Sequence, residues 1–287
     1  MNSPKLHMRM SQRGFTLIEL MIAVTIGLVL TVVVASLFLH SRSTYGSTDE
    51  ISRMQENIRY SQQLLTRMVH HASYTSAGNS FKDVEEAPVG SAPFVVFDAV
   101  AQPALAVTNG GAAAPDTFTV RFQGSGNALG TADGSMTDCH GRAVAAGQMS
   151  VNTFSIAAGL NGGLALWCNS LLGGAAALNL EVVPDVENMQ LVFGEDMVDG
   201  RDGSLRRDGS AERYLPATDI ASANANKIVV LRVALLFATP NAATVVAEPN
   251  RTYDLNGVTV GPFVDKQIRR PVTMTLNLRN RYWSVYK

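Results

Sequence analysis

The chain has 287 residues, of which 46% are hydrophobic and only 16% are charged, and its formal net charge is -1. This length accommodates one large domain or two small ones, and such an apolar, weakly charged composition excludes a wholly disordered chain. The near-zero net charge provides no overall basic footprint for nucleic acid. Two cysteines are too few for a disulfide-dense scaffold or a four-cysteine zinc site.

The chain begins with a short basic leader followed by a long uncharged run. Residues 1–14 contain three Lys or Arg residues and no acid, and residues 20–39 contain no charged residue. A helix of about twenty mostly apolar residues spans the roughly 30 Å of a bilayer core. Because basic residues mark the cytoplasmic side of a span, the sequence predicts a single membrane helix with the leader in the cytoplasm and the remainder outside.

Two simpler explanations of this run fit less well. A secretory signal peptide has an apolar stretch of about 7–15 residues followed by a small-residue cleavage site, whereas here the stretch is longer and the small residue, Gly14, precedes it. A plain anchor has no use for Glu19, because a carboxylate in a membrane is costly and calls for a partner. The glycine and the acid therefore indicate a more specific signal.

The order of basic leader, Gly14, Phe15-Thr16-Leu17-Ile18-Glu19 and apolar run resembles the class III signal of type IV pilins and pseudopilins. The resemblance implies that a prepilin peptidase cleaves after Gly14 and methylates the new N-terminal residue, Phe15. It also implies that Glu19 sets the register between subunits in the filament core, where a neighbour's N-terminal amine neutralises an otherwise costly carboxylate. Loss of the leader changes the net charge from -1 to -4.

A long helix is predicted over residues 15–75, because no proline lies between Pro4 and Pro88. We expect Gly46 and its Ser/Thr-rich surroundings to loosen this helix where it leaves the membrane. Apolar or small residues recur at alternating steps of three and four in its second half, which predicts a one-sided stripe. The stripe comprises Ile51, Met54, Ile58, Ser61, Leu65, Met68 and Ala72. We expect it to pack against the chain's own sheet, with a two-stranded coiled coil as the alternative.

Residues 76–287 contain short apolar runs separated by Gly, Pro, Asn and Asp clusters, which predicts an antiparallel, β-rich domain laid against the helix. The expected strands are 94–98, 117–122, 149–157, 163–168, 178–183, 188–193, 227–238, 271–279 and 282–286. The predicted fold class is therefore α+β. Its parts are a leader at 1–14, a helix at 15–75 with its span at about 15–39, and one globular domain.

Few residues of this domain are candidates for a disulfide, a metal site or a catalytic site. Cys139 and Cys168 lie in the part expected outside the cytoplasm, which favours a disulfide; free thiols, or a metal site that includes His140, are the alternatives. Asp199 and Asp202 are candidates for a calcium loop, but a solvated turn fits better because the spacing of oxygen ligands is irregular. No nucleophile, phosphate-binding or zinc-protease motif is evident, so the sequence predicts neither an enzyme nor a cofactor.

Two stretches resemble the PilW family of minor pilins. One is 186–194 with the acidic, glycine-rich turn after it and Arg213-Tyr214, and the other is 269–280. The resemblance implies the type IV pilin-like fold. It also implies an inner-membrane complex with other minor pilins and a large pilus-tip adhesin. That complex primes assembly of the major pilin at the inner-membrane assembly platform and ends at or near the pilus tip.

Two alternatives remain at this point. A type II secretion pseudopilin of the GspJ kind shares the signal and the architecture. A pilus-tip adhesin or DNA-uptake pilin would instead bind surfaces or DNA directly. DNA binding requires an exposed basic strip with aromatic side chains, and the net charge of -4 on the mature chain argues against it.

Overall fold

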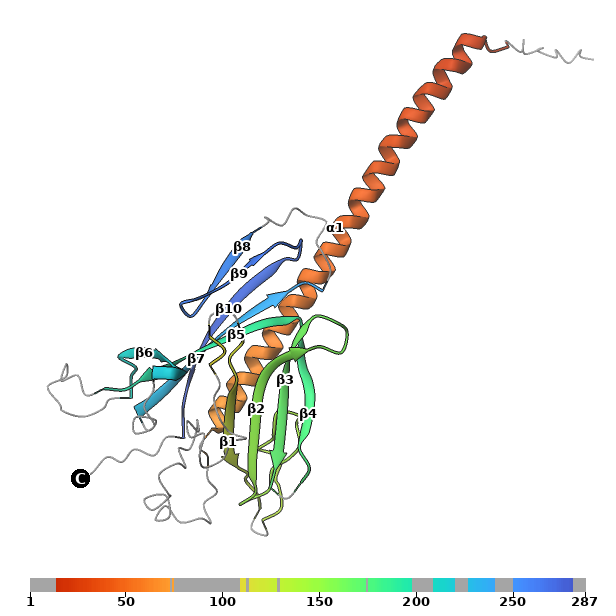
Figure 1. Cartoon of the computed structure of the whole chain (residues 1–287). Helices are drawn as coiled ribbons and strands as arrows, with labels where there is room; N and C mark the ends of the chain where they lie inside the picture. The colour runs from red at the N-terminus through yellow and green to blue at the C-terminus, as the bar shows by residue number, and fades with distance from the viewer. Residues whose placement is uncertain are drawn as a thin grey trace, which may run out of the picture. The chain divides into compact units, whose positions relative to one another are not determined.

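The computed structural model describes residues 14–72, 74, 109–111, 114–127, 130–173, 175–197, 209–219, 227–240 and 250–280. The chain divides into two compact units, Met1–Thr48 and Asp49–Lys287. The helix α1 (Leu17–His71) begins in the first unit and ends in the second (Figure 1). It passes through Gly46 without a break, so the expected loosening at this glycine does not interrupt the helix.

The first unit is an apolar helix with no core of its own. Its segment Leu17–Ser41 is long and apolar enough to cross a membrane, and every side chain from residue 14 to residue 41 is exposed. The hydroxyls of Thr25, Thr31 and Ser36 donate to carbonyls of the same helix at 2.8–2.9 Å. These polar groups are therefore satisfied without water, as a helix in lipid requires.

The second half of α1 buries the predicted stripe. Met54, Leu65 and Met68 are at most 5% exposed, and they join one hydrophobic cluster with residues of the sheets. Leu64 and Val69 are also buried and widen the stripe. Arg53, Glu56, Arg59 and Arg67 lie off the stripe and are exposed, as expected. The chain's own sheets thus cover the stripe, as predicted, although Ile51 remains exposed.

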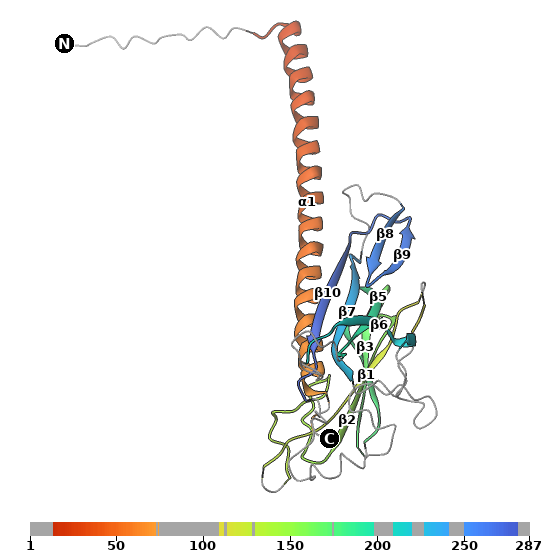
Figure 2. The ribbon, with the colours of Figure 1, turned by 90° about the vertical axis from the view of Figure 1, so that its left-hand side faces the viewer.

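In its described residues, the second unit also contains two four-stranded antiparallel sheets and a hairpin (Figures 1 and 2). The first sheet has the order β1-β2-β3-β4, with β1 (Phe118–Gln123), β2 (Met149–Ala158), β3 (Leu164–Leu172) and β4 (Leu178–Pro184). The second has the order β10-β7-β5-β6, with β5 (Val186–Glu195), β6 (Arg213–Pro216), β7 (Ile228–Ala238) and β10 (Arg269–Asn277). A short 3-10 helix, η2 (Ala217–Asp219), follows β6, and β8 (Arg251–Leu255) pairs with β9 (Val258–Phe263).

The predicted strands from 117 to 279 are present within a few residues of their expected ends, and the α+β class is confirmed. The expected strands 94–98 and 282–286 lie outside the described residues. The β8–β9 hairpin was not predicted, although Asn256 and Gly257 at its turn both have positive φ angles, of 56° and 88°. An Asn-Gly pair between alternating apolar residues is a strong hairpin signal, so this omission was avoidable.

A single residue, Asp185, separates β4 from β5 and carries the chain from one sheet to the other. Its φ is 61°, in the left-handed region that short polar residues such as Asp tolerate. Val183 before it and Val186 after it are fully buried. Both sheets therefore contribute to the same core beneath α1.

The central strand β7 is covered on both faces. Leu231, Val233 and Leu235 face the main core, whereas Ala234 and Leu236 form a second cluster with residues of the β8–β9 hairpin. Burial on both faces explains the nearly continuous apolar run of β7. By contrast, the edge strand β10 runs beside the second half of α1 (Figure 2) and alternates as predicted, with Met274 and Leu276 buried.

Arg269 connects β10 to two neighbouring elements. Its guanidinium pairs with Glu187 of β5 at 2.5 Å and with Asp265 at 2.6 Å, and it lies 3.7 Å from the ring centroid of Phe263 on β9. Burial acts against its charge, but the hydrogen bonds from its two acidic partners prevail and raise the pKa of Arg269. The structure buries Arg269 and exposes its neighbour Arg270.

Candidate functional site

The expected processing site precedes α1 in an open segment. Phe15 is 90% exposed, and no atom lies within 4 Å of the position that a Gly14 side chain would occupy. The described part of the chain therefore leaves the bond between Gly14 and Phe15 sterically accessible.

Thr16 and Glu19 form a reciprocal cap at the start of α1. The backbone N–H and the hydroxyl of Thr16 each donate to Glu19 Oε2 at 2.9 Å, and the Glu19 N–H donates to Thr16 Oγ1 at 3.3 Å. This is the capping-box geometry, which satisfies N–H groups that a helix start leaves unpaired. The Thr-x-x-Glu spacing was visible in the sequence, but its capping role was missed.

The cap leaves one Glu19 oxygen outside its hydrogen bonds. All contacts of the cap use Oε2 or the Thr16 hydroxyl. Glu19 Oε1 can therefore accept a hydrogen bond from a cationic group of another molecule while the cap stays intact. An acid in the first turn also interacts favourably with the positive end of the helix dipole.

In the globular unit, the Cys139–Cys168 pair expected from the sequence is present as a disulfide. Neighbouring Asp138 is fully buried and accepts hydrogen bonds from Arg142 Nε at 2.7 Å and Ser170 Oγ at 2.8 Å. Burial acts to raise the pKa of Asp138, but these hydrogen bonds outweigh it and hold the pKa below its usual value. The disulfide and the buried acid together anchor the loop between β1 and β2 to β3.

The described residues provide no complete set of ligands at either ion site considered from the sequence, the cysteine–His140 group or the Asp199–Asp202 turn. His140 lies beside the two cysteine sulfurs, but sulfurs bonded to each other supply no thiolate ligand. The Nε2 of His140 lies 3.1 Å from the Leu178 carbonyl oxygen. Asp199 and Asp202 lie outside the described residues.

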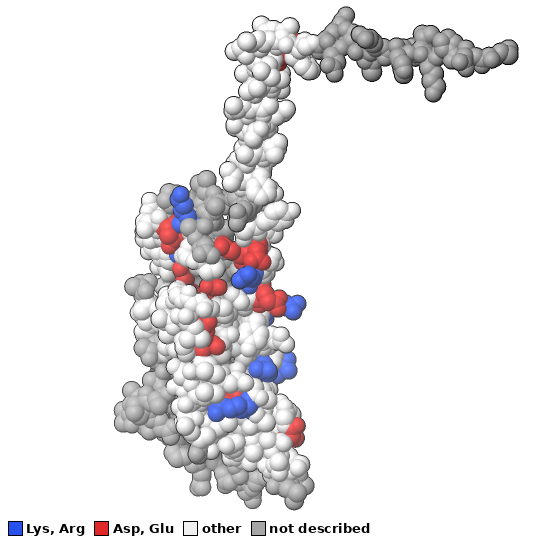
Figure 3. Space-filling view, turned by 90° about the vertical axis from the view of Figure 1, so that its right-hand side faces the viewer, with Lys and Arg blue, Asp and Glu red and all other residues white. Residues whose placement is uncertain are grey.

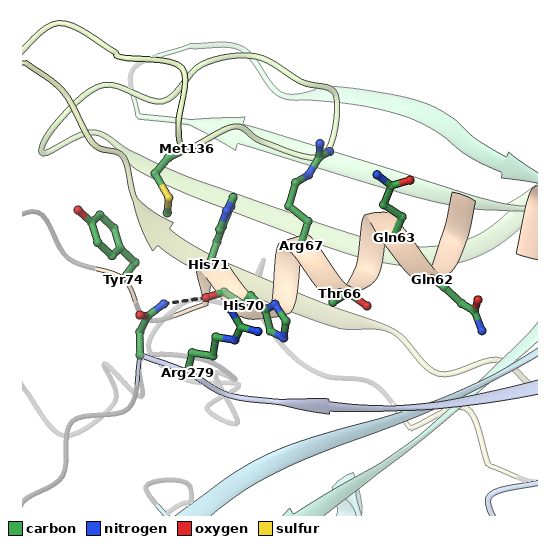
Figure 4. Close-up of a pocket in the computed structure, with 10 residues that line it drawn as sticks. Gln62, Gln63, Thr66, Arg67, His70, His71, Tyr74, Met136 and Arg279 are labelled. Atoms are coloured by element: carbon green, nitrogen blue, oxygen red, sulfur yellow. Dashed lines mark hydrogen bonds between the residues drawn. The ribbon is translucent and has the colours of Figure 1, made fainter. Parts of the chain in front are cut away.

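A cleft of about 680 Å³ lies at the C-terminal end of α1 (Figure 4). Its lining residues are Gln62, Gln63, Thr66, Arg67, His70, His71, Tyr74, Met136, Arg279 and Asn280. The Asn280 side-chain amide donates to the carbonyls of His70 at 2.8 Å and Ala72 at 3.2 Å. A side chain that follows β10 thus caps the end of the helix.

The cleft carries positive charge. Burial lowers the pKa of His71, and Arg67 and then His70 lower it further. Burial and then Arg279 lower the pKa of His70. Both imidazoles are therefore neutral at pH 7, and two guanidinium groups provide the charge of the cleft.

A second cleft, of about 710 Å³, lies between α1 and the ends of β3 and β4. It includes the carboxylates of Glu181, Asp185 and Glu187. Burial, followed by the nearby charges of Glu181 and Glu50, raises the pKa of Asp185. The globular unit therefore has one basic and one predominantly acidic cleft along α1, within a surface that carries charges of both signs (Figure 3).

Two protein families match this chain, one at its N-terminus and one in its globular unit. The prokaryotic N-terminal methylation motif matches residues 9–35, which include Gly14, Phe15 and Glu19. The type IV pilus-assembly protein W model matches residues 153–280, from β2 to the residue that caps α1. The chain is therefore similar to the PilW family of type IV pilus-assembly proteins over residues 153–280, and it carries the N-terminal methylation motif at 9–35.

The similarity to the PilW family indicates which partners to expect. Proteins of this family are generally not enzymes, and the family implies pilins and a prepilin peptidase as partners. The methylation motif and apolar helix agree with an inner-membrane prepilin that later joins a pilus. No characterised protein and no solved structure matches the chain.

The basic cleft was not predicted from the sequence, although the charge pattern of α1 contains one signal for it. Arg53 and Arg59 each have an acid three or four positions away on α1, Asp49 and Glu56 respectively, and pair with it. Arg67 has Gln63, Leu64, His70 and His71 at those positions. An arginine without a helical counter-charge is a candidate for contact with another element or another molecule.

Proposed function

We propose that this protein is a minor pilin of the PilW family that helps to prime type IV pilus assembly within a minor-pilin complex. The exposed apolar helix carries the proposal. Side chains from Leu17 to Ser41 are all exposed, so their apolar surface must be covered by lipid or by the spans of other subunits. Such a bundle of spans offers the major pilin a template for addition at the inner-membrane assembly platform.

Processing by a prepilin peptidase would prepare this helix for the filament. Cleavage after Gly14 removes the basic leader 1–14 and creates a methylated amine on Phe15. Glu19 then pairs through its remaining oxygen with the N-terminal amine of a neighbouring subunit, which sets the register between the two helices. The long helix at 15–75 and the globular domain at 76–287 form the mature protein, which passes from the inner membrane to the pilus tip beside the adhesin.

A secretion pseudopilin of the GspJ kind is the other candidate with the same signal. The match over 153–280 is to a pilus-assembly family, and this observation favours the pilus. Direct binding of DNA has no comparable support, because the face of the globular unit drawn in Figure 3 mixes acidic and basic groups.

Deletion of the gene in its native host, with surface pili imaged by electron microscopy, tests the proposal. We expect deletion to remove most surface pili and the full-length gene to restore them. Glu19→Ala should fail to restore pili or to co-purify with other pilins. Glu56→Ala is the matched control, because Glu56 is an exposed acid on the same helix that pairs only weakly with Arg59 at 3.6 Å. Normal piliation after deletion would refute the proposal.

A further inference from the structure

Two arginines of the basic cleft differ from the ion-paired arginines of the described globular unit. Guanidinium groups at five other positions lie within 4.0 Å of a carboxylate; they are Arg53, Arg59, Arg142, Arg213 and Arg269. Arg67 and Arg279 line the cleft, and none of its described lining residues is acidic. Among the residues that the structure describes, no carboxylate forms an ion pair with either arginine.

The end of α1 does not supply the missing negative charge. Its last carbonyls carry partial negative charge and attract cations. Here the carbonyls of His70 and Ala72 already accept hydrogen bonds from the Asn280 amide. The guanidinium groups of Arg67 and Arg279 are exposed and available to a further anion.

The rest of the cleft suits a peptide. Gln62, Gln63 and Thr66 add amide and hydroxyl groups to the lining, and Tyr74 and Met136 add apolar surface (Figure 4). Guanidinium groups bind carboxylates through paired, charge-assisted hydrogen bonds. A nucleic acid would require a longer track of cations and exposed aromatic rings, whereas the described lining has two arginines and one half-buried tyrosine.

We propose that this cleft binds an acidic segment of a neighbouring pilin, with Arg67 and Arg279 in contact with its carboxylates. The inference rests on the proposed minor-pilin function, to which it adds a lateral contact of the globular unit. Spans packed side by side hold neighbouring globular units at high effective concentration, so a few charged contacts select the partner without a large interface.

Zero-length cross-linking of the full-length protein in host membranes tests this contact. Arg67→Lys and Arg279→Lys preserve the positive charge and add an amine that a carbodiimide couples to a carboxylate in contact with it. We expect an adduct between position 67 or 279 and an Asp or Glu of another pilin, identified by mass spectrometry. Arg270→Lys is the matched control, because Arg270 is an exposed arginine of β10 outside the cleft. An equal adduct at position 270, an adduct with a second copy of this chain, or no adduct would overturn the proposal.

Charge reversal provides a second measurement. The Arg67→Glu/Arg279→Glu double variant should reduce co-purification of the cross-linked pilin by about tenfold or more, since like charges across an interface are strongly unfavourable. Arg270→Glu should leave it unchanged. Protection of Cys139 and Cys168 from alkylation verifies folding, and Arg67→Gln/Arg279→Gln replaces the reversal if that variant does not fold.

The outcomes separate this inference from the function on which it rests. If gene deletion leaves pili unchanged, the proposed function fails. If deletion removes pili but both cleft double variants restore pili and normal co-purification, the cleft inference alone fails.

Discussion

The membrane helix and the globular unit use apolar residues in opposite ways. Side chains from residue 14 to residue 41 are all exposed, whereas Phe118, Phe154 and Leu235 are completely buried in the core. Apolar surface left in water costs about 25 cal/mol per Å², so the helix needs lipid or other helices while the globular unit covers its own surface. The first region therefore needs a partner surface, and the second forms its own core.

Charged residues show the same difference. Glu19 is the one acidic residue of the segment Leu17–Ser41, and it is held by its own helix cap. In the globular unit, Arg269 and Asp138 make several ionic hydrogen bonds that tie separate elements together. Substitutions that change one region and spare the other can test this division.

A core substitution should have the largest effect. Phe154 is fully buried and stacks on Phe118 with ring centroids 5.0 Å apart. We expect Phe154→Ala to lower the free energy of unfolding by about 3–5 kcal/mol through lost burial and a residual cavity. Leu30→Ala, a substitution in the exposed helix, should leave it unchanged. Urea denaturation of the full chain in detergent, followed by tryptophan fluorescence, measures the free energy of unfolding of both variants. Equal losses in the two variants would contradict the difference between the two regions.

Removal of the disulfide should have a comparable or slightly smaller effect. Cys139 and Cys168 are 29 positions apart, and the loop-entropy model gives a contribution on the order of 3–4 kcal/mol for such a loop. We expect the Cys139→Ser/Cys168→Ser protein to unfold at lower urea concentration and still to fractionate with membranes. Loss of membrane association would show that the two regions are not independent.

Loss of the helix cap should have a smaller effect, confined to the first region. Thr16→Val removes the hydroxyl that bonds Glu19 in both directions, and lost N-caps cost about 1 kcal/mol. Hydrogen exchange should accelerate at the first turn of α1 and remain unchanged in the globular unit. Thr25→Val is a suitable control, since the Thr25 hydroxyl bonds a carbonyl within the helix. Unchanged hydrogen exchange at the first turn would show that the Thr16 hydroxyl does not stabilise the start of α1.

The smallest expected effect is the dependence of stability on pH through His71. Burial and neighbouring cations lower its pKa below the ordinary value of 6.5 in the folded state. The unfolded chain therefore binds a proton first as the pH falls, so the stability of the globular unit should decrease between about pH 7 and pH 5. His71→Gln should weaken this dependence and His40→Gln, in the first unit, should not. Thermal unfolding at several pH values measures this dependence. The prediction would be contradicted if stability changed equally with pH in the His71→Gln variant and in the unchanged protein.

Local patterns predicted much of the fold. The stripe on α1 and the alternation in β10 were correct because a helix or strand with one buried face repeats its apolar residues at a fixed period. The Asn256-Gly257 turn was equally local and was overlooked. The burial of Arg269 could not be read in this way, because its partners include Glu187, 82 positions away.

The candidate sites also differ in whether their residues are neighbours in the sequence. The segment 14–19, where we propose that processing occurs, is contiguous with its capping box, and this pattern was visible in the sequence alone. The basic cleft combines α1 with Met136 and with Arg279 and Asn280, and its Asn280–His70 hydrogen bond joins residues 210 positions apart. Its position depends on the way β10 packs beside α1.

By itself, the sequence predicted the long apolar helix, the N-terminal methylation motif, the stripe on α1 and most strand positions. Each of these depends on the spacing or chemistry of neighbouring residues. The tertiary structure alone decided the two-sheet topology, the burial of Arg269 and the presence of Arg67 and Arg279 in the lining of one cleft. Those features depend on which distant segments share a core, since the burial of an apolar face does not specify its partner until the whole chain has packed.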